Sequence, residues 1–153
     1  MHPAPAIEFA FEVRAILAPP LEIGRTPHGE RRIIPVTGGT FEGPDIQGRV
    51  VPGGADWQLI RLDGVTEVDA RYTLETSTGA LIYVSNRGIR HGPPEAMARL
   101  RAGEPVDPSL YYFRAVPSFE TSAGELQWLV QSIFVSTGER HAAHVVIRFW
   151  RLM

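Results

Sequence analysis

Apolar and polar side chains alternate with a period of two along most of this chain. Near the start, Ile7, Phe9 and Phe11 alternate with Glu8 and Glu12, and this pattern predicts a half-buried β-strand over residues 6–18. Later runs of β-branched, aromatic and aliphatic residues predict further strands. These cover residues 21–25, 30–36, 46–51, 56–62, 69–76, 81–87, 110–116, 126–135 and 145–152.

Short segments rich in glycine, proline and polar residues separate the predicted strands. Asp63-Gly64 and the segment 77–79 indicate hairpin turns, and residues 136–144 are polar and loop-like. The glycine-rich tract 37–44 has no lysine and no helical pattern behind it. Turns and β-bulges therefore explain it better than a phosphate-binding loop does.

Only the segment near residues 93–102 has the pattern of a helix. Prolines stand at its start, Glu95 falls in the first turn, and Arg99 and Arg101 fall in the last. These residue types suit the positive and negative ends of a helix dipole, and Gly103 is placed to end the helix.

Many short strands joined by short turns favour antiparallel connections over an α/β sheet. Closing such a sheet removes its exposed edges, so a barrel is preferred to a sandwich. We therefore expect an all-β protein with a single domain over residues 1–153. The expected fold is an antiparallel meander barrel of about nine to eleven strands, lipocalin-like in shape, with one short helix.

Composition narrows the chemistry that such a barrel can carry. All fifteen basic residues are arginine, cysteine is absent and the net charge is −2. Lysine Schiff-base and thiolate chemistry are excluded, and nothing favours nucleic-acid binding. No apolar run is long enough to cross a bilayer and no signal peptide is recognisable, so we expect a cytoplasmic protein with no membrane contact. A homodimer is a base-rate expectation for such a protein.

Candidate acid–base residues lie on the strand predicted at 69–76. Asp69, Arg71 and Glu75 share one face of it, and Tyr72 and Leu74 share the other. If the charged face looks into the barrel, Glu75 or Asp69 could act as a base, because a carboxylate in a pocket can have a raised pKa. If it looks outward, these residues form surface ion pairs. The sequence leaves both alternatives open.

Aromatic and polar side chains supply candidate ligand contacts. Aromatic walls with a few polar groups are typical of small-molecule pockets, although such residues also pack cores. The candidates are Trp57, Tyr72, Tyr83 and Trp128 for contact area, and Arg71, Asn86 and Arg114 for polar recognition. His141 and His144 have a spacing found among metal ligands, but no third ligand is evident, so no metal or other cofactor is predicted.

Several separated motifs resemble one known family over nearly the whole chain. They are the segments 38–44 (GGTFEGP), 51–58 (VPGGADWQ), 69–75 (DARYTLE), 112–114 (YFR) and 132–135 (SIFV). Together they resemble domain-of-unknown-function family 3237, the UPF0311 group. The resemblance implies a small, mostly bacterial β-barrel protein without an assigned activity, and it supplies no catalytic residues.

Three functions remain compatible with these observations. The first is a barrel that binds a hydrophobic or aromatic, anionic small molecule in its interior. The second is a cofactor-independent acid–base enzyme in the same cavity, such as an isomerase, lyase or cyclase. The third is a structural or protein-interaction module with a filled core and an exposed apolar patch.

Overall fold

The computed structural model describes all 153 residues, and β-strands make up most of it. The strands are β1 (Ile7–Leu17), β2 (Leu21–Thr26), β3 (Gly29–Glu42), β4 (Gln47–Ile60), β5 (Thr66–Thr76), β6 (Leu81–His91), β7 (Tyr112–Glu120), β8 (Phe134–Arg140) and β9 (His144–Leu152). Two short α-helices, α1 (Pro94–Arg101) and α2 (Gln127–Val130), lie between them. Neither helix is long and apolar enough to span a membrane.

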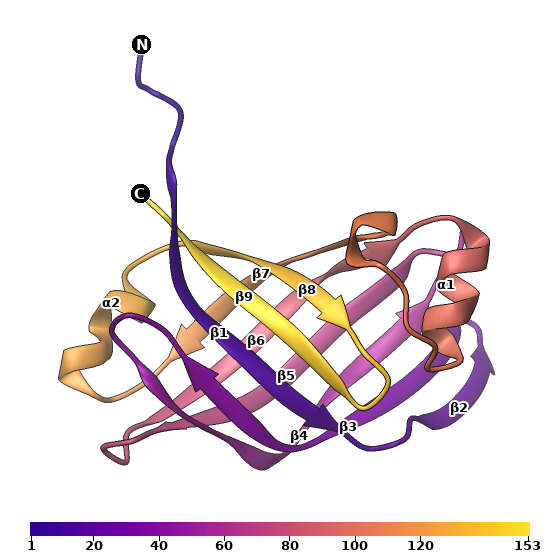
Figure 1. Ribbon diagram of the computed structural model, residues 1–153, viewed down its shortest axis with the longest axis horizontal. Helices are drawn as coiled ribbons and strands as arrows, with labels where there is room; N and C mark the ends of the chain where they lie inside the picture. Colours follow the sequence, from indigo (N-terminus) through magenta and orange to yellow (C-terminus); the bar gives the residue numbers. More distant parts are fainter.

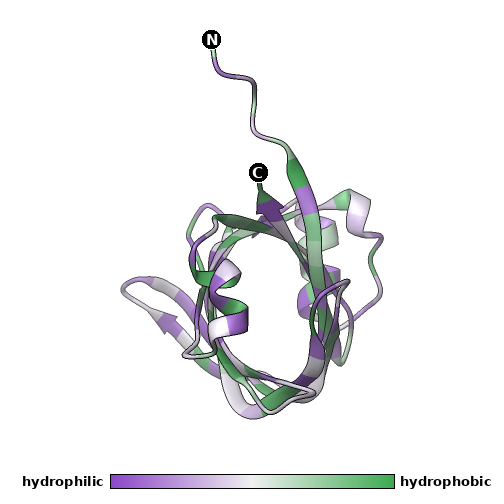
Figure 2. Ribbon diagram, turned by 90° about the vertical axis from the view of Figure 1, so that its left-hand side faces the viewer, coloured by the Kyte–Doolittle hydropathy of each residue, from purple (hydrophilic) through white to green (hydrophobic).

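Antiparallel pairing closes the strands into a barrel. Neighbouring strands follow the order β1-β9-β8-β7-β6-β5-β4-β3-β2, and β1 also pairs with β3. This last pairing makes a ring of eight strands and leaves β2 outside it, paired with β3 alone. Figure 2 shows the ring end-on. The predicted antiparallel meander barrel is thereby confirmed.

The glycine-rich tracts bend long strands instead of ending them. The register shifts between Val36 and Thr40 in β3 and between Val51 and Ala55 in β4. Residues 46–51 and 56–62, predicted as separate strands, therefore belong to one strand. At Gly39 the φ angle is +130°, and a Cβ would lie 2.0 Å from the carbonyl oxygen of Arg14 in β1. The barrel closes between β1 and β3 because this residue lacks a side chain.

Two predictions about the C-terminal region are wrong. The first part of the strand predicted at 126–135 instead forms a 3₁₀ turn (Gly124–Leu126) and α2, which bury Leu126 and Leu129. The start of the loop predicted at 136–144 instead continues β8 to Arg140. Ser136 is buried there because Asn86 inside the barrel accepts a hydrogen bond from its hydroxyl, at 3.2 Å.

The two helices lie at opposite ends of the barrel (Figure 1). Helix α1, predicted near 93–102, has Glu95 in its first turn and arginines in its last, and it buries Ala96 and Leu100. Helix α2 packs against β7 at the other end. Each end of the barrel interior is thus covered by a different helix, and the side chains inside the two halves differ as well.

Candidate functional site

The interior is not filled in the half of the barrel nearest α1. Ten apolar and five polar residues from all eight strands of the ring line a cavity there. The centre of a water molecule can occupy about 50 Å³ of this cavity. All empty space between the lining atoms, including the mouth, amounts to about 570 Å³. The lining residues are Ala15, Leu17, Ile34, Val36, Asp56, Gln58, Val68, Ala70, Tyr72, Asn86, Arg90, Phe113, Arg140, Val145 and Ile147.

Strand β4 brings a carboxylate into this cavity. Asp56 and Gln58 point inward, whereas Trp57 between them is exposed on the outer surface. The Asp56 carboxylate accepts two hydrogen bonds of 2.9 Å, from Gln58 Nε2 and from the backbone N–H of Asp69. Burial raises the pKa of Asp56, and these hydrogen bonds and the Arg90 charge oppose that rise.

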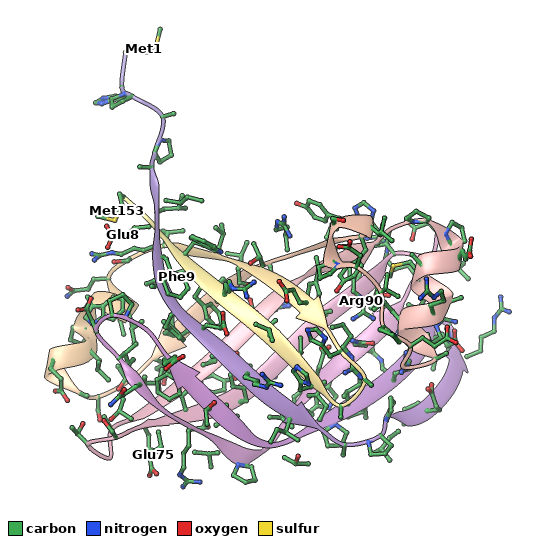
Figure 3. All side chains as sticks on the ribbon, in the orientation of Figure 1. Met1, Glu8, Phe9, Glu75, Arg90 and Met153 are labelled. Atoms are coloured by element: carbon green, nitrogen blue, oxygen red, sulfur yellow. The ribbon has the colours of Figure 1, made fainter.

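Strand β6 brings a guanidinium into the same space. Arg90 is only 4% exposed, and its Cζ lies 5.5 Å from the centroid of the Phe113 ring. Its Nε has no hydrogen-bond partner. Burial lowers the pKa of Arg90 to about 10, still well above neutral pH, so the side chain remains a cation. Figure 3 labels Arg90 near the α1 end of the barrel.

Two further residues that line the cavity each have a buried polar atom without a partner. These atoms are Gln58 Oε1 and the hydroxyl of Tyr72 on β5. Burial alone raises the pKa of Tyr72, so the hydroxyl stays protonated and can donate a hydrogen bond. Buried polar groups in folded proteins are almost always hydrogen-bonded, which makes three unpaired atoms around one cavity unusual.

Positive charge exceeds negative charge around the cavity. The guanidinium groups of Arg32 and Arg140 lie close enough to Arg90 to lower its pKa, and Asp56 is the carboxylate that opposes them. Arg32 also lies 3.1 Å from Glu22 at its Nε, but the Nε–H is not directed at that carboxylate. Arg140 donates to the backbone carbonyls of His141, in the turn before β9, and of His144, the first residue of β9. An anionic group in the cavity would therefore be stabilised.

The structure brings only some of the sequence-predicted site residues together. Tyr72 and Asn86 line the cavity. Trp57, Arg71, Tyr83 and Arg114 are exposed on the outer surface, and Trp128 packs on Phe134 at the opposite end of the barrel. The expectation that these five share a pocket is corrected, because the strand register points the first four outward and the helix carries the fifth away.

The two predicted base candidates also lie on the outer wall. On β5, Tyr72 and Leu74 point inward, so Asp69 and Glu75 point outward. Glu75 pairs with Arg49 at 2.8 Å, and Asp69 pairs with Arg71 at 3.3 Å. Figure 3 labels Glu75 at the outer surface. The alternative of surface ion pairs is the correct one for this face.

Sequence reasoning did not identify Asp56, Gln58 and Arg90 as a group. In the segment 56–62 the polar residues alternate with Trp57 and Leu59, and amphipathicity alone would place the aromatic side chain inside. The available signal was Ile60, which shares a face with Asp56 and Gln58 and is buried. Recognising it requires the register between β4 and the strands on either side.

The two histidines considered as metal ligands lie at the ends of the turn that leads from β8 into β9. The rings of His141 and His144 stack with centroids 4.4 Å apart, and His141 Nε2 lies 3.7 Å from Glu139. No group of three histidine or carboxylate side chains is arranged to hold a metal ion. We assign no binding role to this pair.

Comparison with known proteins places the chain in a family. Residues 5–152 match the family model described as protein of unknown function, DUF3237. A UPF0311 protein of Rhodopseudomonas palustris is 45% identical over 147 residues, which is 96% of each chain.

Two solved structures resemble the whole chain. A conserved protein of unknown function from Rhodopseudomonas palustris is 43% identical, with a TM-score of 0.94 and full coverage of both chains. An enzyme from Penicillium herquei is 21% identical, with a TM-score of 0.74 and coverage of 100% of this chain and 98% of its own. At that identity the second likeness shows the fold alone. The chain belongs to the DUF3237 (UPF0311) family of β-barrel proteins.

Proposed function

We propose that this barrel binds a small molecule with an apolar body and one anionic group in the cavity near α1. The observation that carries the proposal is the set of buried, unpaired polar atoms on residues that line the cavity: Gln58 Oε1, the Tyr72 hydroxyl and Arg90 Nε. Leaving such a group buried and unpaired costs about 1–3 kcal/mol. A ligand that reaches these atoms would remove that cost.

The chemistry of the lining defines the ligand class. Ten of the fifteen lining residues are hydrophobic, which favours an aliphatic or aromatic body. Arg90 offers a buried N–H that carries positive charge, and such a donor hydrogen-bonds an anionic oxygen more strongly than a neutral one. The guanidinium groups of Arg32 and Arg140 strengthen the preference for an anion.

Ordered water is the competing occupant. A cavity of about 50 Å³ has room for a few water molecules, and polar lining atoms could hold them. Water would satisfy the same three atoms but would show no preference for charge or shape. The test must therefore compare two ligands of one shape that differ in charge.

Benzoate and benzamide make that comparison. We expect titration of the ¹⁵N-labelled protein with benzoate to shift the Arg90 Nε–H resonance, and benzamide to bind at least tenfold more weakly. In Arg90→Met the preference for benzoate should disappear. In Arg71→Met it should persist, because Arg71 is an exposed arginine on the outer wall. Equal affinity for the two compounds, or an unchanged preference in Arg90→Met, would contradict the proposal.

Catalysis in the same cavity is a second candidate function. The observation that favours it is the Asp56 carboxylate, which points into the barrel and lines the same cavity as Arg90 and Tyr72. A carboxylate and a cationic donor at one cavity are the parts that acid–base catalysis requires. The fungal protein with the same fold is described as an enzyme, which supports testing this chain for turnover.

A purely structural module would have an interior filled with side chains. The interior of this barrel is not filled along its whole length. The buried apolar core extends from the α2 end to residues of α1, but the cavity leaves part of the α1 half empty. Apolar side chains such as Trp57 and Ile89 are exposed on the outer wall, where they line one shallow hollow together with charged residues. Exposed apolar residues interspersed with charged ones are ordinary on protein surfaces, so they do not favour a docking function.

A further inference from the structure

We propose that Asp56 accepts a proton from a carbon next to a ketone carbonyl, while Arg90 and Tyr72 hold the carbonyl oxygen as it becomes an enolate. The inference rests on the proposed binding function, since the ketone must occupy the same cavity. It names a substrate class, small ketones with an apolar body, and a reaction class, proton transfer between carbon and oxygen or between two carbons.

The carboxylate is held in place with free capacity to accept a proton. Gln58 Nε2 donates to Asp56 Oδ2, and the backbone N–H of Asp69 donates to Oδ1, each at 2.9 Å. A carboxylate oxygen has two lone pairs, so each oxygen keeps one for a substrate proton. Both donors belong to strands of the barrel wall, which fixes the position of the carboxylate, as a general base requires.

Two donors with no acceptor are present for the developing oxyanion. Arg90 Nε–H and the Tyr72 hydroxyl are buried and unpaired, and both residues line the same cavity as Asp56. Arg90 acts on Asp56 through charge and not through a hydrogen bond, so its Nε–H is free for a substrate. Donors fixed before the reaction stabilise charge that develops in the transition state, because they need no reorganisation.

The proposed step balances without a co-reactant. The C–H bond next to the carbonyl breaks, its proton forms an O–H bond with Asp56, and the electron pair moves to the carbonyl oxygen. The enolate oxygen then accepts hydrogen bonds from Arg90 and Tyr72. Return of the proton from Asp56 to the same carbon regenerates the ketone, whereas its return to the oxygen or to a conjugated carbon gives an isomer. Each of these steps restores the carboxylate.

Hydrogen–deuterium exchange into phenylacetone tests this step. In D₂O, we expect the folded protein to accelerate loss of the benzylic proton signal at least a hundredfold over buffer, and benzoate to inhibit the exchange. Asp56→Asn should remove at least 99% of that acceleration while the variant still binds benzoate. Glu75→Gln is the matched control, since Glu75 is the carboxylate on the outer wall, and its exchange rate should equal that of the original protein.

A second variant tests the oxyanion donors separately from the base. Tyr72→Phe retains the carboxylate and removes one oxyanion donor, so the exchange rate at saturating phenylacetone should fall about tenfold. The rate should also rise with pH as Asp56 loses its proton. This rise should be centred above pH 3.8, the ordinary value for aspartate, because burial raises the pKa of this group.

The outcomes separate the two proposals. If benzoate binds through Arg90 but phenylacetone exchanges no faster than in buffer, proton transfer is refuted and binding stands. If exchange is accelerated equally in folded Asp56→Asn, the role of Asp56 is refuted. If benzoate does not bind and no exchange occurs, both proposals fall.

Discussion

The two halves of the barrel interior are built from the same strands and differ in what fills them. In the α2 half, the rings of Phe11, Phe119 and Phe149 pack with centroids 4.7 to 5.6 Å apart, and Phe134 lies 5.1 Å from Phe119. Phe41 completes this cluster at 6.0 Å from Phe11. In the α1 half, inward-facing positions of β4, β5 and β6 carry Asp56, Gln58, Tyr72 and Arg90 around empty space.

The difference indicates that the two halves of the interior have different roles. Close-packed aromatic rings bury much apolar surface and gain dispersion energy, so the α2 half stabilises the fold. Unpaired buried polar atoms and a cavity have the opposite effect, and natural proteins retain such features mainly at functional sites. Stability and binding should therefore respond to mutations in different halves.

The largest expected effect is on stability, from truncation in the α2 half. Phe149 is fully buried and stacks on Phe11, so Phe149→Ala should lower the free energy of unfolding by about 3–5 kcal/mol. Phe113→Ala, at the edge of the cavity, should cost at least about 1 kcal/mol less, because one side of its ring already lacks packing partners. Urea unfolding measures both free energies. Equal losses of stability in the two variants would contradict the different roles of the two halves.

The next largest effect on stability is expected from enlarging one valine in each half of the interior. Val50 and Val36 are both buried, but only Val36 lines the cavity. Val50→Leu should destabilise the protein by about 1–3 kcal/mol through overpacking. Val36→Leu should be neutral or stabilise it by up to about 1 kcal/mol by filling empty space, and it should weaken benzoate binding. The same unfolding measurement tests this pair, and a similar loss from both variants would show that the α1 half is solid.

A pH-dependent effect follows from the buried carboxylate. The pKa of Asp56 is raised in the folded protein, so the folded state binds more protons between the unfolded and folded values. The stability contributed by this group is fully present below the unfolded value of about 3.8 and is lost as pH rises through the folded value. Asp56→Asn should therefore stabilise the protein by about 0.5–2 kcal/mol at pH 7, and the gain should shrink toward pH 4.

The asparagine can be accommodated without a new unpaired atom. The backbone N–H of Asp69 can still donate to its amide oxygen, and Gln58 can turn its unpaired Oε1 toward the amide N–H. Unfolding curves recorded from pH 4 to pH 8 test the sign of the effect. A stability difference that grows toward low pH would contradict the assigned pKa shift.

The fold could be predicted from the sequence because it depends on local patterns. Alternation, Asp63-Gly64 and the turn at 77–79 place the hairpins, and the number of strands favours closure. The helix α2 was missed because the segment 126–135 is apolar, and a short apolar run can form either a strand or a buried helix turn. Only contact with the barrel end decides between them.

The site was harder to predict from the sequence, because its residues depend on which face of each strand points inward. A shift of one residue in register moves every side chain to the opposite face. For β5 the apolar face is inside, as amphipathicity predicts, whereas β4 places Asp56 and Gln58 inside and Trp57 outside. Neighbouring strands impose this choice on β4, since Ile34 and Ala70 pair with Asp56 in the barrel wall.

The smallest expected effect is on the outer wall, where Glu75 pairs with Arg49 at 2.8 Å. Both side chains are substantially exposed, so Glu75→Gln should change the free energy of unfolding by about 0.5 kcal/mol or less. That difference should fall further in 1 M salt, because the Debye length there is only about 3 Å and solvent-exposed ion pairs are weakened. Benzoate affinity, measured by the same NMR titration, should be unchanged, because the barrel wall separates Glu75 from the cavity. A large loss of affinity would mean that the outer face, and not the α1 half of the interior, holds the ligand.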